Sequence, residues 1–220
     1  MSTYVITGAN RGIGLELARQ CKARGDTVVA VCRKSSPELD ALGVRVESGV
    51  DVAKESAGAD LKARLGKTTV DVLVHNAGVL VHDTLANVDE NSLRTQFEVN
   101  AMGPVLVTKA LAPLLTKGSK IAIVTSRMGS AADNSSGGAY GYRMSKAAVN
   151  IAGVSLAVDL KKQGVAVVIV HPGFVKTDMT HGSGNVEPAD SAKDILARID
   201  ALTVETSGKF LHANGETLPW

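Results

Sequence analysis

The chain has 220 residues, of which 45% are hydrophobic, and its 24 lysines and arginines nearly balance its 22 aspartates and glutamates, for a formal net charge of +2. We expect residues 1–220 to form a single domain whose core needs no disulfide bonds. The near-neutral charge and an aromatic content of only 3% disfavour nucleic acid as a partner. No apolar run approaches the ~18 to 20 residues of a membrane-spanning helix, so no membrane segment is expected.

The cysteines and histidines point away from metal and redox chemistry. Cys21 and Cys32 match neither a metal-binding spacing nor a C-x-x-C motif, so we expect buried, reduced thiols and a cytoplasmic location. The five histidines show neither H-x-x-x-H nor H-E-x-x-H spacing, and no metal site is expected.

Short β-branched runs alternate along the chain with longer stretches of helical periodicity. The runs predict strands at residues 3–7, 27–32, 44–47, 70–75, 120–125 and 165–171, with a candidate seventh at 208–211. The stretches predict helices at residues 13–24, 54–65, 91–117, 142–163 and 188–202. The strands read as continuous apolar runs, which are typical of burial on both faces, and a helix-length crossover follows each. The pattern predicts a doubly wound parallel α/β sheet of about seven strands, with helices on both faces.

A glycine-rich turn follows the first strand directly. Residues 7–14 place Gly8, Gly12 and Gly14 in a G-x-x-x-G-x-G pattern that leads into a helix. Such a turn lets the backbone approach a pyrophosphate, and the positive end of the helix favours the anion. The glycines alone could also serve only a tight connection, but the strand-turn-helix context favours phosphate binding.

Basic residues follow the second strand, where an NAD site carries a carboxylate. Arg33 and Lys34 stand there, the nearest carboxylate is that of Glu38, and Arg11 of the glycine turn can reach the same point. A guanidinium holds a phosphate dianion through two hydrogen bonds, so the sequence predicts NADP as the cofactor. The alternative is that Arg33 is a solvated surface charge. Asp51, after the third strand, either accepts from the adenine amino group or caps the next helix.

Tyr142 and Lys146 lie four residues apart on one face of a predicted helix. The pKa of a free phenol is near ~10, and the ammonium of Lys146 together with an oxidised nicotinamide ring is expected to lower it toward ~7. Tyr140 has Met144 rather than a cation four residues later, and we expect it to line the pocket.

Two further polar residues stand where chemistry is expected. Ser126 follows the fifth strand, where its hydroxyl can bind a substrate carbonyl oxygen, although alone it would read as a turn serine. Asn100 lies between Val99 and Ala101 in the predicted helix 91–117. Because an amide is unfavourable inside a helix, these apolar neighbours indicate a buried side chain with a polar partner.

Together these residues resemble the short-chain dehydrogenase/reductase family over essentially the whole chain. The matching motifs are the turn at residues 7–14, Asn76-Ala77-Gly78 after the fourth strand, Asn100, Ser126, Tyr142 with Lys146, and Pro172-Gly173 followed by Thr177. Within the family the chain is most similar to small carbonyl reductases of the sniffer and C-factor type. That similarity depends on Gly8-Ala9-Asn10-Arg11, on residues 126–129 and 134–138, and on the final residues 215–220.

The resemblance implies a Rossmann fold and NADPH-dependent, reversible reduction of ketones or aldehydes. It implies Tyr142 as general acid/base, Ser126 orienting the carbonyl, Lys146 binding the nicotinamide ribose, and Asn100 holding a water in a proton relay. The cofactor-binding residues that it implies are Gly8, Asn10, Arg11, Gly12, Ile13, Gly14, Arg33, Asp51, Val52, Asn76, Ala77, Gly78, Tyr142, Lys146, Pro172, Gly173, Val175 and Thr177. Two features depart from the family: His75 stands where an asparagine is frequent, and the interval between Ser126 and Tyr142 is long.

The remaining expectations concern partners. A small carbonyl compound is the expected substrate, although an NADP-binding signalling or scaffold protein without turnover would share the fold. Arg127 and Arg143 are either substrate-binding or structural cations, and residues 130–138 are expected to form a mobile loop. Helix 142–163 is apolar around most of its circumference, so we expect it and helix 91–117 to pair with their copies in a homodimer or homotetramer. The alternative is cover by helices of the same chain.

Overall fold

A computed structural model describes residues 1–220 and contains one seven-stranded sheet. The strands are β1 (Thr3–Thr7), β2 (Thr27–Val31), β3 (Arg45–Glu47), β4 (Val70–His75), β5 (Leu115–Val124), β6 (Ala166–His171) and β7 (Phe210–His212). They are all parallel, in the order β3-β2-β1-β4-β5-β6-β7. The winding direction reverses between β1 and β4, which creates a crevice at their carboxyl ends. The predicted doubly wound Rossmann fold is confirmed.

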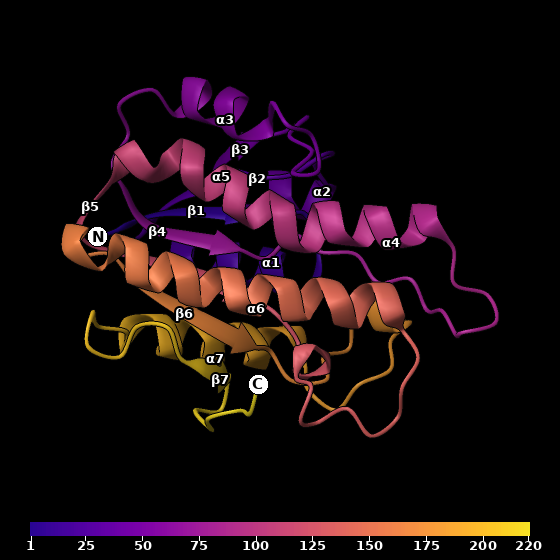
Figure 1. The fold of residues 1–220 in the computed structure, drawn as a ribbon. Helices are drawn as coiled ribbons and strands as arrows, with labels where there is room; N and C mark the ends of the chain where they lie inside the picture. Colours follow the sequence, from indigo (N-terminus) through magenta and orange to yellow (C-terminus); the bar gives the residue numbers. More distant parts are fainter.

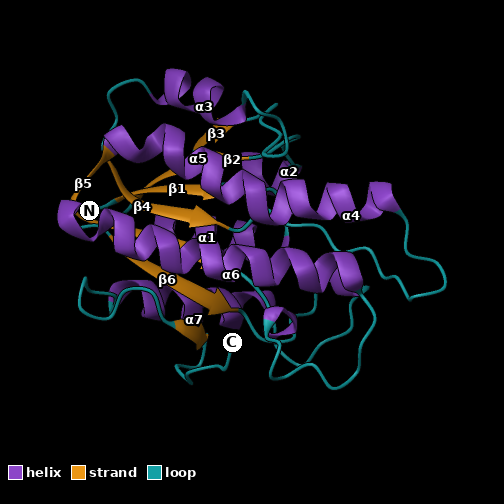
Figure 2. Cartoon of the chain, in the orientation of Figure 1, coloured by secondary structure: helices purple, strands orange, loops and turns teal.

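Helices cover both faces of the sheet (Figure 1; Figure 2). The longer helices are α1 (Gly12–Ala23), α3 (Ala57–Leu65), α4 (Glu90–Phe97), α5 (Gly103–Leu111), α6 (Tyr140–Leu160) and α7 (Pro188–Asp200). The shorter turns are α2 (Pro37–Asp40), η1 (Glu98–Met102), η2 (Ala112–Leu114), η3 (Arg127–Gly129), η4 (Lys161–Gln163) and η5 (Asp178–Thr180). Helices α1 and α7 pack on one face, and α3, α5 and α6 pack on the other.

Alternate residues of each strand enter two separate cores. In β1, Tyr4 and Ile6 face α1 and α7, whereas Val5 faces α3, α5 and α6. Side chains of a strand point to opposite faces in turn, so a strand buried on both faces must be apolar throughout. Burial on both faces, which was inferred from the continuous apolar runs in the sequence, is therefore confirmed.

The prediction of one continuous helix at residues 91–117 is wrong. This segment consists of α4, the π-helical turn η1, α5 and the short η2, and the chain enters β5 at Leu115. Two prolines explain the breaks. Pro104 has no N–H to donate to the carbonyl of Asn100 four residues earlier, and the helix widens to a π turn at that point; Pro113 ends the helical path in the same way.

Three smaller features complete the fold. The side chains of Cys21 and Cys32 are buried and unpaired, as predicted. The imidazole of His75, at the end of β4, is buried, and its Nε2 lies 2.7 Å from the hydroxyl of Thr108 on α5. No helix combines the length and the apolar character that a membrane crossing requires.

Candidate functional site

A cavity of about 770 Å³ opens at the carboxyl ends of the central strands. It runs from the glycine turn after β1, past the residues that follow β2, β3 and β4, to the first turns of α6. Its predicted lining residues are Gly8, Asn10, Arg11, Gly12, Ile13, Arg33, Asp51, Val52, Asn76, Ala77, Gly78, Tyr142, Lys146, Pro172 and Thr177. Most of the residues expected to bind the cofactor therefore face one space.

The glycine turn is held by contacts that exclude larger side chains. Gly8 has φ +67°, and a Cβ there would lie 2.8 Å from the Cα of Ala77. A Cβ at Gly14 would lie 2.2 Å from the carbonyl oxygen of Gly8, closer than any real contact. The amide of Asn76 donates to the carbonyls of Thr7 and Gly8 at 3.1 and 3.0 Å. Gly14 thus serves the close packing of α1 on the turn and lies outside the cavity lining.

The start of α1 is open to an anion. No side chain caps this helix, and its first turn contains no acidic residue. Gly12 and Ile13 line the cavity, so the N–H groups that lack a partner in the first helical turn adjoin it. The guanidinium of Arg11 forms an exposed ion pair with Asp178 at 3.0 Å, which competes with the predicted contact to a 2′-phosphate.

Two basic residues mark the other end of the cavity. Arg33 and Lys34 line it, and neither forms an ion pair with a carboxylate of the chain. The hydroxyl of Ser36 donates to the carbonyl of Asn10 at 2.8 Å and joins this loop to the glycine turn. Asp51 also lines the cavity. The alternative role of Asp51 as a helix cap is wrong, because α3 begins at Ala57 and one Asp51 oxygen accepts from the N–H of Ala53.

Tyr142 and Lys146 both enter the cavity from α6 and are buried. The ammonium of Lys146 donates to the carbonyl of Val124 at 3.1 Å and lies 5.6 Å from the centre of the Tyr142 ring. Burial lowers the pKa of Lys146 to about 8 and raises the pKa of Tyr142 to about 12, against a smaller lowering by the Ser126 side chain. In the protein alone, desolvation of the phenolate is therefore the largest effect on the pKa of Tyr142, and the expected lowering by Lys146 together with an oxidised nicotinamide ring stays a prediction.

Ser126 and Asn100 lie beside the cavity rather than among its lining residues. Ser126 is buried at the end of β5, and its hydroxyl accepts from the N–H of Met128. The amide oxygen of Asn100 accepts from the N–H of Val79, and its nitrogen donates to the Val79 carbonyl and to the hydroxyl of Ser145, all between 2.9 and 3.0 Å. The buried amide with polar partners is confirmed. Both N–H groups of the amide are used, and the water that Asn100 is expected to hold stays a prediction.

Some predicted residues fall outside the cavity, and others were missed. Gly173 and Val175 are not among the lining residues, and Val175 is buried against Val186. The lining residues that the sequence did not indicate as cofactor-binding are Leu15, Val31, Cys32, Ser36, Glu38, Val50, Val79, Val99, Val124, Thr125, Lys176, Asp178, Met179 and Pro188. Most directly flank a predicted residue, so their position next to a strand end was the available signal.

The loop between β5 and α6 is organised by cations. Arg143 donates to the carbonyl of Gly138 at 3.1 Å and to the hydroxyl of Ser136 at 2.8 Å. Arg127 lies 3.3 Å from Asp133 and 3.6 Å from Glu216. Both arginines are thus structural cations. Tyr140 is partly exposed and does not line the cavity, so that prediction is wrong.

The cavity and its fold belong to a known class. A family model described as short chain dehydrogenase matches residues 2–187, which include every lining residue except Pro188. The chain belongs to the short chain dehydrogenase family, a class of oxidoreductases.

Two curated relatives are similar over most or all of the chain. The chain is 42% identical to 1-hydroxy-2-glutathionyl-2-methyl-3-butene dehydrogenase of Rhodococcus sp. (strain AD45), over the full length of both proteins. It is 46% identical to C-signal of Myxococcus xanthus, over 69% of this chain and 93% of that protein.

Solved structures of carbonyl reductases share the fold. Carbonyl reductase Sniffer of D. melanogaster superposes with a TM-score of 0.91 at 29% identity, over 100% of both chains. The NADPH-bound carbonyl reductase from chicken fatty liver has a TM-score of 0.89 at 26% identity, over 100% of this chain and 99% of that one.

Proposed function

We propose that the protein is an NADPH-dependent reductase of ketones or aldehydes, which runs in reverse as an alcohol dehydrogenase when NADP⁺ is in excess. The observation that carries the proposal is the presence of Tyr142 and Lys146 in the same cavity as the open N-terminus of α1 and the basic pair Arg33 and Lys34. One end of this space suits a phosphorylated nucleotide and the other suits proton transfer. The similarity to carbonyl reductases supports the same activity.

NADP fits the residues of the cavity. The first turn of α1 offers N–H groups to the pyrophosphate, and Arg33 and Lys34 are free to bind a 2′-phosphate. Glu38 also lines this end, but it follows the basic pair by four residues and does not neutralise it through an ion pair. The NADPH in the chicken carbonyl reductase agrees with this choice.

The cavity can stabilise the reacting carbonyl and supply its proton. When bound, the nicotinamide supplies a hydride to the carbonyl carbon. Ser126 holds the carbonyl oxygen by donating a hydrogen bond, and Tyr142 donates the proton as negative charge develops on that oxygen. A phenol is protonated at neutral pH, which is the state that carbonyl reduction requires, and burial raises the pKa of Tyr142 further in the protein alone.

Lys146 on α6 and Asn100 on η1 support this step. The ammonium of Lys146 binds the nicotinamide ribose and stabilises negative charge on the Tyr142 oxygen after the proton has left. Asn100 holds a water through its backbone carbonyl and so connects the site to solvent for reprotonation. Its side chain fixes Val79 and Ser145 and thereby holds the π turn in place.

A second candidate function is NADP binding in signalling without physiological turnover, which is favoured by the similarity to C-signal. The enzyme and the signalling protein differ in one measurable property. Both bind NADPH, which quenching or enhancement of its fluorescence detects, but only the enzyme oxidises it when a carbonyl compound is added. The panel should include ketones, quinones, aldehydes and a glutathione-conjugated alcohol with NADP⁺, since the Rhodococcus relative is named for such a substrate.

The proposed mechanism is tested by Tyr142→Phe, which removes one hydroxyl and preserves the ring. Loss of the proton donor should lower kcat by ~10² to 10⁴, with the Kd of NADPH little changed. Tyr140→Phe is the matched control, because Tyr140 lies two residues away and outside the cavity, and it should retain most activity. A Tyr142→Phe variant as fast as the parent would show that the phenol is not the proton donor.

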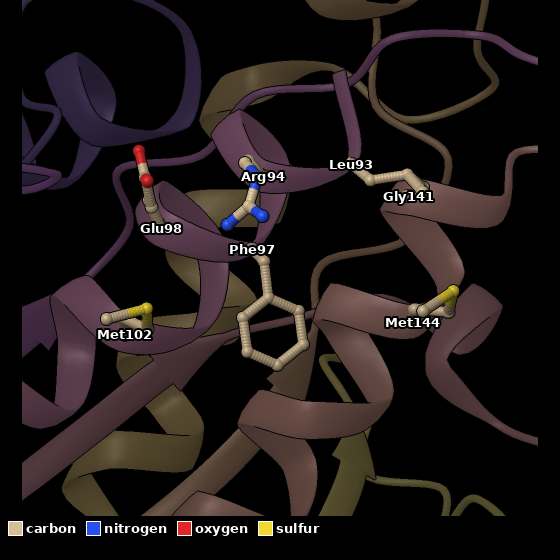
Figure 3. Close-up of a pocket in the computed structure, with 7 residues that line it drawn as sticks. All are labelled: Leu93, Arg94, Phe97, Glu98, Met102, Gly141 and Met144. Atoms are coloured by element: carbon tan, nitrogen blue, oxygen red, sulfur yellow. The ribbon is translucent and has the colours of Figure 1, made fainter. Parts of the chain in front are cut away.

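We also propose that the α4–η1 and α6 surface pairs with its copy in a homodimer. Phe97, Met102, Met144, Ile151 and Val158 are exposed on these elements, and a smaller hollow of about 260 Å³ lies between α4 and α6 with Phe97 at its centre (Figure 3). Sedimentation equilibrium is the test: a mass above the 22.8 kDa of one chain at micromolar concentration supports the proposal, and Ile151→Lys should reduce it. A monomeric parent would refute it.

A further inference from the structure

Asp83 is a buried carboxylate for which the proposed mechanism has no use. Apart from Lys146, it is the only residue of the Lys, Arg, Asp and Glu types that is buried, with 7% of its surface exposed. Burying a carboxylate away from water is costly unless hydrogen bonds replace the lost hydration. Its partners therefore indicate what it does.

The carboxylate of Asp83 caps the helix that carries Tyr142. One oxygen accepts from the N–H of Tyr140 at 2.5 Å and the other from the N–H of Gly141 at 3.3 Å. The carbonyl of Asp83 accepts from the N–H of Ala139 at 2.8 Å. The residue at the N-cap position, Ala139, has no capping side chain. A residue distant in sequence thus binds two donors that the helix leaves without partners.

The chain enters α6 in a conformation that needs such a restraint. Gly137, Gly138 and Ala139 have φ values of +62°, +63° and +46°. A left-handed alanine costs free energy, so an unrestrained chain would leave this conformation. Asp83 binds the N–H groups of Ala139 and of the next two residues. It therefore fixes the point at which the loop ends and the helix begins.

Asp83 is itself held by the segment that forms the cavity wall. The side chain of Asn100 binds both the N–H and the carbonyl of Val79, and the amide oxygen of Gln96 accepts from the N–H of Val81 at 3.0 Å. Residues 79, 81 and 83 thus each hold a neighbouring element through polar contacts. Val79 lines the cavity, so residues 79–83 connect the cavity wall to the first turn of α6.

The first turn of α6 packs closely on α4 at Gly141. Gly141 lies beside Leu93 (Figure 3), and a Cβ at Gly141 would be 2.4 Å from the amide nitrogen of Gln96. Contact on that side and the Asp83 carboxylate at the helix end together define the position of Tyr142, two residues into the helix.

We propose that Asp83 is a positioning residue that sets the location of the Tyr142 hydroxyl for proton transfer. This inference rests on the proposed role of Tyr142 as the proton donor. Proton transfer requires donor and acceptor within hydrogen-bond distance, and a misplacement of about 1 Å can cost up to ~10²-fold in rate. The cofactor end of the cavity depends on the glycine turn and Arg33, which do not contact Asp83. Replacing Asp83 should therefore leave the affinity of the protein for NADPH unchanged.

The experiment compares Asp83→Ala with Asp83→Asn and Asp89→Ala. Asp83→Ala should lower kcat at least tenfold, leave the Kd of NADPH within about twofold, and increase the solvent deuterium isotope effect on kcat because proton transfer becomes slower. Asp83→Asn retains an oxygen that can accept from Tyr140, and kcat should stay within about threefold of the parent. Asp89 caps α4 by accepting from the N–H of Ser92 at 3.0 Å. Asp89→Ala thus removes a comparable cap nearby, and kcat should not change.

Hydrogen exchange of residues 140–143 provides a readout that needs no substrate. Asp83→Ala should increase exchange there, while Asp89→Ala should not. If the alanine variant does not fold, Asp83→Glu keeps the charge but displaces the oxygens by one methylene, and it should lower kcat with the same rise in isotope effect. The proposal is overturned if the folded variant, Asp83→Ala or in its place Asp83→Glu, keeps the parental kcat and isotope effect. It is also overturned if Asp89→Ala lowers kcat as much as Asp83→Ala. If the parent reduces no carbonyl compound but Asp83→Ala still increases exchange at residues 140–143, the proposed function is refuted and the helix cap is established.

Discussion

Lys146 should make the free protein less stable than it would be with an apolar side chain in the same place. The residue is buried, its only hydrogen-bond partner is the carbonyl of Val124, and burial alone lowers its pKa from 10.5 to about 8. At about 1.36 kcal/mol per pKa unit, keeping this ammonium buried at pH 7 costs about 3 kcal/mol.

Lys146→Met tests this cost, because methionine fills a similar volume without the charge. The variant loses one hydrogen bond worth about 1 kcal/mol, so its free energy of unfolding should exceed that of the parent by about 2 kcal/mol at pH 7. Its kcat should fall at least tenfold and its Kd for NADPH should rise, since the proposed ribose contact and the charge beside Tyr142 are both lost. A stabilising substitution that removes activity is the expected relation at a functional site.

The pH dependence of this gain follows from the sign of the pKa shift. The folded protein releases the Lys146 proton above pH 8 and the unfolded chain releases it only near 10.5, so the parent becomes relatively more stable as the pH rises between these values. The advantage of Lys146→Met should therefore shrink by about 1 kcal/mol between pH 7 and 9. Urea denaturation followed by circular dichroism measures both quantities.

Lys120→Met is the matched control for this experiment. The ammonium of Lys120 donates to the carbonyls of Ile199 and Asp200 at 2.7 and 2.9 Å and is only partly buried, so its replacement should destabilise the protein. If Lys146→Met is no more stable than the parent at pH 7, or if its advantage grows with pH, the attributed burial cost is wrong.

Two further substitutions test the acid stability and the cofactor choice. Burial lowers the pKa of His75 to about 3, so below about pH 6.5 the unfolded chain takes up a proton that the folded protein does not. The free energy of unfolding therefore falls between pH 7 and 5, and in His75→Asn this fall should be smaller by about 2 kcal/mol. An unchanged pH slope in urea titrations would contradict this. Arg33→Asp should weaken NADPH binding at least tenfold and NADH binding much less, as measured by fluorescence titration, and an unchanged preference would reject Arg33 as the 2′-phosphate ligand.

The residues that line the cofactor end of the cavity could be predicted from the sequence because they follow the strand ends. The turn from Gly8 to Gly14 connects β1 to α1, and Arg33 lies just after β2. In a parallel sheet the strand ends meet at one edge, so the residues directly after each strand supply most of the cavity lining. Asn76, after β4, and Asp51, after β3, both line the cavity.

The substrate end depends on contacts between segments that are far apart in the chain. Arg127 contacts Glu216, and Asp83 binds the N–H of Tyr140, 57 positions later in the chain. Neither periodicity nor motif spacing records such pairings. The pKa of Tyr142 could not be predicted for a related reason: the lysine four residues away is visible in the sequence, whereas the burial of the phenol is a property of the assembled fold.

The break in the helix at Asn100 was nevertheless predictable from the sequence. Pro104 stands four residues after Asn100, and a proline at that distance cannot donate the hydrogen bond that would close the helical turn on the Asn100 carbonyl. The proline therefore divides the long helix predicted at residues 91–117. The side chain of Asn100 is buried and binds Val79 and Ser145, which holds this part of the chain in place. The pair of Asn100 and Pro104 thus accounts for both the π turn and the carbonyl proposed to hold the relay water.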